Sequence, residues 1–338
     1  MHIMIREFYH IDLRNRNSFR VAQRATRLVE FETIEDLRLF FASGIPEHWM
    51  VLSGGNNILF TEDYDGVLLT PISQNINIIE EDNSTVAVRI DAGVEWDNLV
   101  AWAVSRDLWG IENLSLIPGK VGAAPVQNIG AYGCEVAQVI ERVHLFDVQS
   151  QRTCTLDAAH CGFGYRESVF KQLLKGRVII TGIDIRLSRT PNPRLGYGDI
   201  EREVEKLGGV TLQNIREAIC SIRRSKLPDP NVLGNAGSFF KNPVVDTTVA
   251  ERLLTDFPDM PHYPAANGQV KLAAGWLIDR CGLKGFRDGQ VGVHERQALV
   301  LVNFGGASGG EVIALARKIQ SCVHNKFGVE IAAEVNIL

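Results

Sequence analysis

The feature that most constrains this chain is the stretch "IPGKVGAAPVQNIGAYG", residues 117–133. Its seventeen residues include four glycines, two prolines and a single charge, that of Lys120. Glycine and proline disfavour a regular helix, and a loop surrounded by water is usually far more polar. We interpret the stretch as backbone that wraps closely around a large, partly apolar ligand. A structural Ω-loop, packed by its own side chains, is the alternative.

A second glycine-rich stretch, "SGGNN" (53–57), lies between two strand-like runs. The N–H groups of a tight turn can hold a phosphate, although an ordinary turn explains the pattern equally well. The stretch has neither the G-x-G-x-x-G spacing nor a Walker sequence, so no Rossmann or P-loop site is indicated. Taken together, the two stretches favour a ligand that carries a diphosphate.

The hydrophobic pattern predicts an α+β fold in two domains. Strand-like runs cover 49–60, 66–71, 85–93, 142–149 and 177–187, and a helix is predicted at 95–107. Two prolines and two glycines in "SRTPNPRLGYGD" (188–199) interrupt regular structure. We therefore expect a first domain at 17–190 and a second at 191–338. In the second, helices are predicted at 211–226, 271–281 and 308–328, and a strand at 329–338.

Sequence signals mark the ends of two of these helices. Gly282 follows the helix at 271–281, where glycine commonly adopts a left-handed backbone. Ser308 and Glu311 have the spacing of a capping box, and Gly328 ends the same helix. In the final run, Glu334 lies among apolar residues. Such a carboxylate is either on an exposed strand face or a buried group kept for chemistry.

Composition excludes several classes of function. With 338 residues and a net charge of −5, the chain lacks the basic surface of a broad nucleic-acid binder. Six cysteines without a C-x-x-C pair and eight histidines without an H-E-x-x-H motif indicate reduced thiols and no metal site. The N-terminal segment lacks the apolar region of a signal peptide, and no run is long enough to span a membrane. We expect a soluble, cytoplasmic monomer.

Charged and aromatic residues in three settings are candidates for binding an anion. Arg166 follows Tyr165 in "FGYRES", where it either pairs with a carboxylate or stacks on its aromatic neighbours at the surface. The basic cluster in "SIRRSKLPDP" (221–230) is either a phosphate site or a complement to a helix dipole. Tyr197, in the "GYGD" turn, is either a turn residue or a ring that lies over a ligand.

The stretch "GNAGSFFKNP" (234–243) places a single hydroxyl, Ser238, between a glycine and two phenylalanines. Four roles are open: nucleophile, helix or turn cap, phosphate ligand and proton donor. The nucleophile role lacks the G-x-S-x-G elbow, and no histidine lies nearby in the sequence. The capping role stays open, because serine is common before a helix.

Six strings, in order along the chain, resemble the UDP-N-acetylenolpyruvoylglucosamine reductases, bacterial flavoenzymes that make UDP-N-acetylmuramate for peptidoglycan. The similarity runs from about residue 18 to the C-terminus. The retained "LGYGD" is similar to the longer subtype of that family, which uses the tyrosine in substrate binding. The strings are "IPGKVGAAPVQNIGAYG", "FGYRESVFK", "LPDP", "GNAGSFFKNP", "VKLAAGWLID" and "AAEVNIL".

The resemblance implies an FAD-binding region of the vanillyl-alcohol-oxidase type followed by an α/β substrate-binding domain. It implies non-covalent FAD, NADPH as hydride donor, and UDP-N-acetylglucosamine enolpyruvate as the small-molecule substrate. By motif, Arg166, Ser238 and Glu334 match the catalytic positions. Substrate contacts are implied for Tyr165, Tyr197, Lys226, Asn242, Tyr263, Lys284 and Gln297. Flavin contacts are implied for Ser53, Gly54, Gly55, Asn56, Asn57, Ile117, Pro118, Gly119, Gly122, Ala123, Ala124, Gln127, Asn128, Gly130, Tyr132, Gly133 and Arg223.

The chain departs from the family pattern at four of these positions. The first phosphate turn of the family usually reads G-x-G-S-N, whereas Ser53 replaces its first glycine here and Asn56 its serine. Ala123 and Ala124 stand where relatives often carry hydroxyls. These changes alter the side-chain contacts expected with the FAD diphosphate and leave the backbone N–H contacts in place.

The implied chemistry adds a hydride to an enolpyruvyl group and then protonates the neighbouring carbon. Arg166 suits the carboxylate that gains charge, because its planar fork matches carboxylate geometry. Glu334, expected to be protonated in apolar surroundings, adds a hydrogen bond or a proton. A hydroxyl is a weak acid, yet the carbon base formed here is far stronger than an alkoxide. We therefore predict Ser238 to be the proton donor.

Three other functions compete with this reading. The first is an oxidase of the same fold with covalently attached FAD, for which Cys134, His144 and His160 are the candidate attachment residues. The second is a serine hydrolase. The third is a nucleotide-sugar binding module without flavin.

Overall fold

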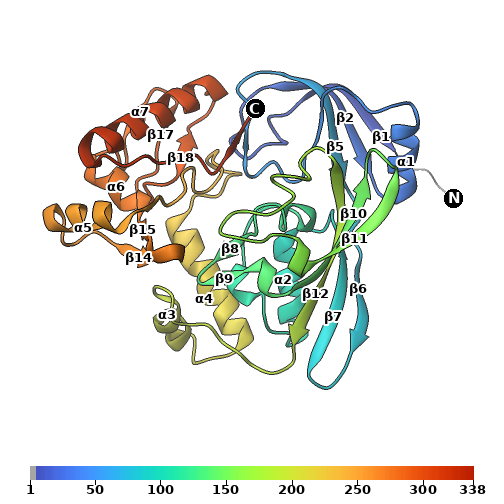
Figure 1. Cartoon of the computed structure of the whole chain (residues 1–338), viewed down its shortest axis with the longest axis horizontal. Helices are drawn as coiled ribbons and strands as arrows, with labels where there is room; N and C mark the ends of the chain where they lie inside the picture. The colour runs from blue at the N-terminus through green and yellow to red at the C-terminus, as the bar shows by residue number, and fades with distance from the viewer. Residues whose placement is uncertain (1–4) are drawn as a thin grey trace. The chain divides into compact units, whose positions relative to one another are not determined.

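The computed structural model describes residues 5–338 and divides into two compact units. The first comprises the N-terminal segment up to residue 11, then 25–54 and 65–223, and the second comprises 12–24, 55–64 and 224–338. Figure 1 shows the elements of both units, coloured along the chain. No local pattern indicated that two short early segments belong with the C-terminal half. The domain boundary at 190 and 191 stays a prediction.

The first unit contains a five-stranded antiparallel sheet in the order β11-β10-β12-β7-β6. The strands predicted at 85–93, 142–149 and 177–187 are confirmed as three members of this sheet. They were recognisable because each carries a continuous or alternating apolar run. The five strands are β6 (Ile76–Glu81), β7 (Thr85–Asp91), β10 (Ile140–Asp147), β11 (Arg152–Asp157) and β12 (Val178–Ser188).

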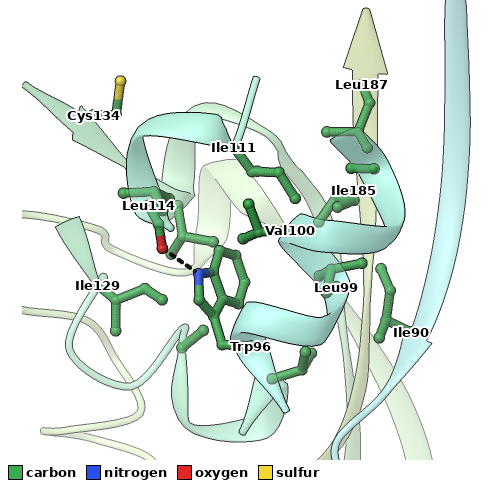
Figure 2. Packing of buried hydrophobic residues seen from close by; sticks show 14 of the residues in the cluster. Ile90, Trp96, Leu99, Val100, Ile111, Leu114, Ile129, Cys134, Ile185 and Leu187 are labelled. Atoms are coloured by element: carbon green, nitrogen blue, oxygen red, sulfur yellow. Dashed lines mark hydrogen bonds between the residues drawn. The ribbon is translucent and has the colours of Figure 1, made fainter. Parts of the chain in front are cut away.

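One face of this sheet packs against helices α2 (Trp96–Val104) and α4 (Leu212–Lys226) in a single apolar core. Figure 2 shows Trp96 in this core, with side chains of β7 and β12 beside the helix. The indole Nε1 of Trp96 donates a hydrogen bond of 3.0 Å to the carbonyl of Leu114, so its one polar atom is satisfied. Both helices were predicted from their spacing, at 95–107 and 211–226.

The opposite face of the sheet carries ion pairs, as the alternation of side chains along a strand requires. Asp184, only 1% exposed, accepts hydrogen bonds of 2.8 and 2.9 Å from the Arg89 guanidinium. The Nε2 atom of His144 lies 2.8 Å from the same carboxylate. Burial by itself would raise the pKa of Asp184, but Arg89 and His144 together lower it.

A four-stranded sheet in the order β1-β2-β5-β3 completes the large elements of the first unit. Helix α1 (Ile34–Ala42) follows β2, begins with a capping box between Thr33 and Asp36, and packs in the core next to this sheet. The run predicted at 49–60 forms two short strands on either side of the "SGGNN" turn. The strands are β1 (Arg6–Asp12), β2 (Arg24–Phe31), β3 (Trp49–Val51), β4 (Ile58–Leu59) and β5 (Tyr64–Pro71), of which β4 belongs to the second unit.

The second unit combines short strands with three helices. Strand β4 pairs in parallel with β19 (Asn336–Ile337). One three-stranded sheet contains β13 (Val244–Val245), β15 (Val270–Leu272) and β14 (His262–Pro264), and another contains β16 (Arg287–Asp288), β17 (Val291–Val293) and β18 (Leu301–Asn303). The helices are α5 (Thr247–Asp256), α6 (Ala274–Arg280) and α7 (Gly309–Phe327).

Sequence signals located α7 well and α6 less well. The capping box of Ser308 and Glu311 is present, and Gly328 ends α7 with φ 67°. The helix predicted at 271–281 begins later, at Ala274, because 270–272 pair as a strand on both sides. The strand predicted over 329–338 is wrong for most of its length, since regular pairing is limited to β19 and one bridge at Ala333.

The remaining elements are short. No helix among residues 5–338 is long and apolar enough to cross a membrane. Within the same residues, no group of three or more His, Cys, Asp or Glu side chains is placed to hold a metal ion. The short elements are α3 (Ile200–Lys206), β8 (Gly130–Ala131), β9 (Cys134–Glu135), and the 3-10 turns η1 (Glu112–Leu114), η2 (Val121–Ala123), η3 (Val136–Gln138), η4 (Ala158–His160) and η5 (Ala266–Gly268).

Candidate active site

The glycine-rich segment 117–133 is mostly irregular and is anchored near the start of α2. The N–H of Trp96 donates to the carbonyl of Gly119 (2.8 Å), and the N–H of Gly122 donates to the carbonyl of Ala92 (3.0 Å). A Cβ added to Gly122 would lie 2.7 Å from the Cβ of Ala92, far closer than packed carbon atoms approach. Glycine at 122 is therefore required by the packing of the segment itself.

The predicted flavin contacts of this segment differ in how much surface they present. Ala124 and Asn128 are each only 1% exposed, so their side chains are inside the unit. At Ala124, the N–H is also used, in a hydrogen bond to the carbonyl of Val121. The rest are half-buried (Ile117, Gly119, Gly122, Ala123, Gln127, Gly130, Tyr132) or exposed (Pro118, Gly133).

The buried side-chain atoms of the first unit that lack a hydrogen-bond partner include Ser53 Oγ and Arg223 Nε. The Arg223 guanidinium also donates to the hydroxyl oxygen of Tyr132; burial lowers the pKa of Arg223 and raises that of Tyr132. Burying a charged group is costly unless it is paired. An anionic ligand beside Arg223 and Ser53 would reduce that cost, so both residues fit the flavin contacts implied for them.

The turn at 53–57 leads from the first unit into the second, where it lies next to the C-terminal segment. Gly55 has φ +64°, and a Cβ on it would lie 2.0 Å from the carbonyl oxygen of Arg16, so only glycine fits. The side-chain Nδ2 of Asn57 donates to the backbone carbonyl of Glu334 (3.3 Å). A predicted flavin residue and a predicted catalytic residue are thus neighbours within the second unit.

Arg166 lies in an irregular loop of the first unit and has a left-handed backbone, with φ 57°. Its guanidinium donates to the carbonyl of Gly130 at 3.0 Å and, at the 3.5 Å limit of a hydrogen bond, to that of Asn128. It also lies 5.9 Å from the ring centroid of the half-exposed Tyr165. Stacking on an aromatic neighbour, one of the two alternatives for Arg166, is therefore present as its contact with Tyr165. The hydrogen bonds to the two carbonyls direct the guanidinium toward the segment 117–133.

Ser238 and Glu334 occupy neighbouring, paired segments of the second unit. Ser238 forms a bridge with Val300, and the next N–H, that of Phe239, donates to the carbonyl of Leu299 (2.7 Å). On the other side, the N–H of Glu334 donates to the carbonyl of Phe239 (2.7 Å). The segment of Ser238 is thus paired on both of its edges, and its half-buried hydroxyl has a rigid support.

The structure argues against two of the roles left open for Ser238, those of helix cap and nucleophile. The helix-capping role is wrong, because the next helix, α5, begins at Thr247 with Asp246 as its N-cap. A serine–histidine pair is disfavoured as well. His294 donates its backbone N–H to the carbonyl of Val300, a fully buried residue. Since Ser238 pairs with the same valine, the histidine is two strand spacings away, roughly 10 Å.

Two predicted substrate residues, Asn242 and Gln297, each lie beside the first turn of α6. The Oδ1 atom of Asn242 accepts the N–H of Ala274 (3.0 Å), which leaves its Nδ2 group as the donor available to a ligand. The Oε1 atom of Gln297 accepts the N–H of Leu299 (3.3 Å), and a Cβ on Gly275 would lie 3.3 Å from it. Sequence reasoning missed Gly275, whose lack of a side chain leaves room for Gln297.

The other predicted substrate residues of the second unit are exposed cations and an aromatic ring. Tyr263, 45% exposed, pairs across the strands with Lys271 in β14 and β15. The Nζ atom of Lys284 donates to Asp279 (3.3 Å). Lys226 is the last residue of α4 and is exposed. Lys226 ends its helix and Lys284 lies in the loop after α6, a common place for ligand contacts, whereas Tyr263 is the middle residue of β14.

Tyr197, in the first unit, is 52% exposed and packs edge-on against Tyr132, with ring centroids 6.0 Å apart. The side chain of Asn113, which sequence reasoning missed, joins the same two segments. Its Nδ2 group donates to the carbonyls of Tyr132 (3.1 Å) and Arg194 (2.9 Å). Asn113 is 1% exposed. Burial is its distinguishing feature, and no sequence motif marks it.

The three candidates for covalent flavin attachment lie in separate settings. Cys134 is buried, and burial raises the pKa of its thiol, which disfavours the reactive thiolate. His144 lies on the polar face of the five-stranded sheet, beside Asp184 and within hydrogen-bond distance of Thr155 (3.2 Å). His160 is exposed at η4. Nothing in their surroundings favours attachment at any of them.

Two protein-family models match the chain. The model described as the C-terminal domain of UDP-N-acetylenolpyruvoylglucosamine reductase matches residues 229–338. The model described as an FAD binding domain matches residues 28–152. The second match includes the "SGGNN" turn and the segment 117–133, the two stretches for which a diphosphate ligand was predicted. The expected α+β fold with an FAD-binding region is confirmed.

Full-length relatives share almost half of the sequence. The UDP-N-acetylenolpyruvoylglucosamine reductase of Chromobacterium violaceum is 49% identical over 335 residues, 97% of this chain and 98% of the relative. The enzyme of the same name from Pseudomonas aeruginosa is 48% identical, with the same two coverages. The crystal structure of UDP-N-acetylenolpyruvylglucosamine reductase from Thermus caldophilus is 23% identical. It covers 99% of both chains with a TM-score of 0.70, which shows a shared fold.

Proposed function

Because the chain belongs to the UDP-N-acetylenolpyruvoylglucosamine reductase family, we propose that it converts UDP-N-acetylglucosamine enolpyruvate to UDP-N-acetylmuramate with NADPH as reductant. The observation that carries the proposal is the similarity at 49% identity over 97% of the chain. The paired segments of Ser238 and Glu334 support the chemistry, because they bring a hydroxyl and a carboxyl side chain into one unit. The product serves peptidoglycan synthesis, and through it cell-wall biogenesis, cell shape and cell division.

FAD is held non-covalently in this proposal, by the turn 53–57, the segment 117–133 and Arg223. When bound, the flavin supplies the hydride that is taken from NADPH and added to the terminal carbon of the enolpyruvyl group. Asn56 and Ala123 leave the diphosphate contacts mainly to backbone N–H groups, as the departures from the family pattern suggest. The buried Ser53 Oγ and Arg223 Nε are the side-chain donors that fit an anion.

Arg166 binds the substrate carboxylate. Negative charge develops next to that carboxylate and spreads onto its oxygens, where a permanently charged guanidinium is the best available donor. Removing one preorganised donor of this kind costs roughly 2.7–4 kcal/mol of transition-state stabilisation. Glu334 donates a second hydrogen bond or a proton to the same oxygens.

Ser238 delivers the proton to the carbon adjacent to the carboxylate. A neutral hydroxyl suffices because the substrate carbanion is a much stronger base than the alkoxide that results. The two edge pairings of the segment 238–240 hold in place the backbone that carries the hydroxyl, and this limits the distance over which the proton must move.

Substrate recognition uses residues from loops, from the end of α4 and from strand β14. Tyr197, Lys226 and Asn242 hold the diphosphate of the substrate, and the remaining contacts come from Tyr165, Tyr263, Lys284 and Gln297. We further propose that the protein acts in the cytoplasm as a monomer without nucleic-acid or membrane partners, in keeping with its net charge of −5.

An anaerobic titration tests the whole proposal. Purified protein should show flavin absorption bands that NADPH bleaches and that UDP-N-acetylglucosamine enolpyruvate restores. Denaturation should release the yellow chromophore into the supernatant, since the flavin is not covalently bound. A colourless protein that cannot be reconstituted with FAD would instead favour a nucleotide-sugar binding module.

A further inference from the structure

Two buried side chains tie the loop of Arg166 to the glycine-rich segment, all within the first unit. Ser168, only 1% exposed, donates its hydroxyl to the carbonyl of Val126 at 2.6 Å. Asn128, also 1% exposed, donates its Nδ2 group to the carbonyl of Gly164 at 3.1 Å. The two bonds lie on either side of Arg166 in the sequence, so they restrain both ends of its loop.

The guanidinium of Arg166 donates two further hydrogen bonds from the loop to the glycine-rich segment, to the carbonyls of Gly130 and Asn128. Four hydrogen bonds therefore join 126–130 to 164–168. The left-handed backbone of Arg166, at φ 57°, is uncommon for a residue with a side chain. Such a conformation persists only where the surrounding structure enforces it. The two backbone bonds between Gly164 and Glu167 close the turn around Arg166 (3.0 and 3.2 Å), and the four bonds hold that turn against 126–130.

The side chain of Asn128 has little capacity left for a ligand. Besides Gly164, its Nδ2 group donates to Glu135 Oε2 (2.8 Å), and its Oδ1 atom accepts the N–H of Ala137 (3.1 Å). Both kinds of polar atom in the amide are thus used inside the unit. The flavin contact that the family resemblance implies for Asn128 stays a prediction, and its side chain helps to fix the carbonyls to which Arg166 donates.

We propose that Ser168 and Asn128 are positioning residues that act through Arg166. By setting the direction of its guanidinium, they determine how the substrate carboxylate is bound. This inference rests on the proposed function, because it is that reaction which uses Arg166. A displacement of about 1 Å in a reacting or binding group can cost on the order of 100-fold in rate, so even a small loosening of the loop is measurable.

Ser168→Ala is the main variant, and Ser115→Ala is its matched control. Ser115 is fully buried in the same unit and donates its hydroxyl at the same distance, 2.6 Å, to the carbonyl of Glu112. Both variants remove one buried hydroxyl that donates to a backbone carbonyl, at similar cost to folding. Only the Ser168 variant lies in the Arg166 loop. If Ser168→Ala does not fold, Ser168→Cys keeps a side chain of similar size with a weaker donor.

The first measurement separates the two half-reactions by anaerobic stopped flow. Ser168→Ala should slow flavin reoxidation by the enolpyruvyl sugar about tenfold, with flavin reduction by NADPH unchanged. Ser115→Ala should change neither rate. Wild-type protein that is reduced by NADPH but not reoxidised by the sugar would overturn the proposed function. Active wild type with unaffected Ser168→Ala would overturn only the present inference.

The second measurement is a double-mutant cycle with Arg166→Lys. If Ser168 acts through the guanidinium fork, Ser168→Ala should slow reoxidation by less than about twofold once the fork is gone, since the two residues are coupled. An equal effect of Ser168→Ala in both backgrounds would mean a purely structural role and would overturn the inference.

The third measurement needs no turnover. Hydrogen–deuterium exchange of peptides that cover 163–169 should be faster in Ser168→Ala than in wild type, because the loop loses a buried tie. Exchange in Ser115→Ala should match wild type over the same peptides. Unchanged exchange in Ser168→Ala would show that the hydroxyl does not restrain the loop, whatever the activity of the protein.

Discussion

The backbone N–H of Glu334 donates a hydrogen bond of 2.7 Å to the carbonyl of Phe239, the residue that follows Ser238. Phe239 in turn donates its N–H to Leu299 at the same distance. Residues far apart in the sequence thus support one another in a small set of paired segments. Because backbone atoms make this pairing, side-chain substitutions at 238 and 334 remove chemistry without removing the support, and their roles can be tested separately.

Ser238→Ala should separate the two half-reactions of the proposed enzyme. Ser238 has no role while NADPH reduces the flavin, so that step should proceed at a near wild-type rate with FAD normally bound. Reoxidation by the enolpyruvyl sugar should fall by roughly 10²–10⁴-fold, the usual effect of removing a general acid. Anaerobic stopped-flow absorbance of each step measures both rates.

Ser238→Cys provides the control for this test. A thiol still carries a proton, so part of the lost reoxidation rate should return. If Ser238→Ala slows flavin reduction as much as flavin reoxidation, the assignment as proton donor is wrong.

Lys226→Ala should weaken binding of the UDP-sugar and leave bound flavin in place. Hydrogen bonds to charged groups contribute roughly 1.5–3 kcal/mol, so the Michaelis constant for the UDP-sugar should rise at least about tenfold. Lys206→Ala, at an exposed lysine of α3 paired with Glu203, is the matched control and should change nothing. An unchanged Michaelis constant in Lys226→Ala would remove this residue from the substrate site.

Gly122→Ala should destabilise the first unit and weaken FAD binding together. The added methyl group would lie 2.7 Å from Ala92, and overpacking of this kind costs typically 1–3 kcal/mol. Thermal unfolding with and without FAD measures both effects. Gly196→Ala, where an added Cβ meets nothing within 4 Å, is the control. Equal stability of the two variants would contradict the observed contact.

Asp184→Asn should make stability less sensitive to acid. Arg89 and His144 lower the pKa of Asp184 in the folded protein, so its stabilising contribution is present above the unfolded value of about 3.9. That contribution is lost as the pH falls through the folded pKa. In urea unfolding, the free energy of unfolding of wild type should therefore be well above that of Asp184→Asn at pH 7. This difference should shrink below about pH 4. A difference independent of pH would exclude the ion pairs as its cause.

Much of the fold followed from local sequence patterns. The strands β7, β10 and β12 and the helices α2, α4 and α7 were predictable because apolar spacing and end signals such as Ser308, Glu311 and Gly328 act over a few residues. The start of α6 and the C-terminal run were predicted less well. In both, pairing with distant strands decided the backbone conformation, and no local pattern encodes such pairing.

For the site, the sequence by itself determined which side chains we propose to carry the chemistry, because Arg166, Ser238 and Glu334 each lie in a short motif. Only the tertiary structure decided how they are held. It excluded the helix-cap role of Ser238, placed Glu334 on the neighbouring segment, and revealed the buried hydroxyl of Ser168. The physical reason is that burial and long-range hydrogen bonds depend on which segments pack together, whereas a motif records only the identity and order of residues.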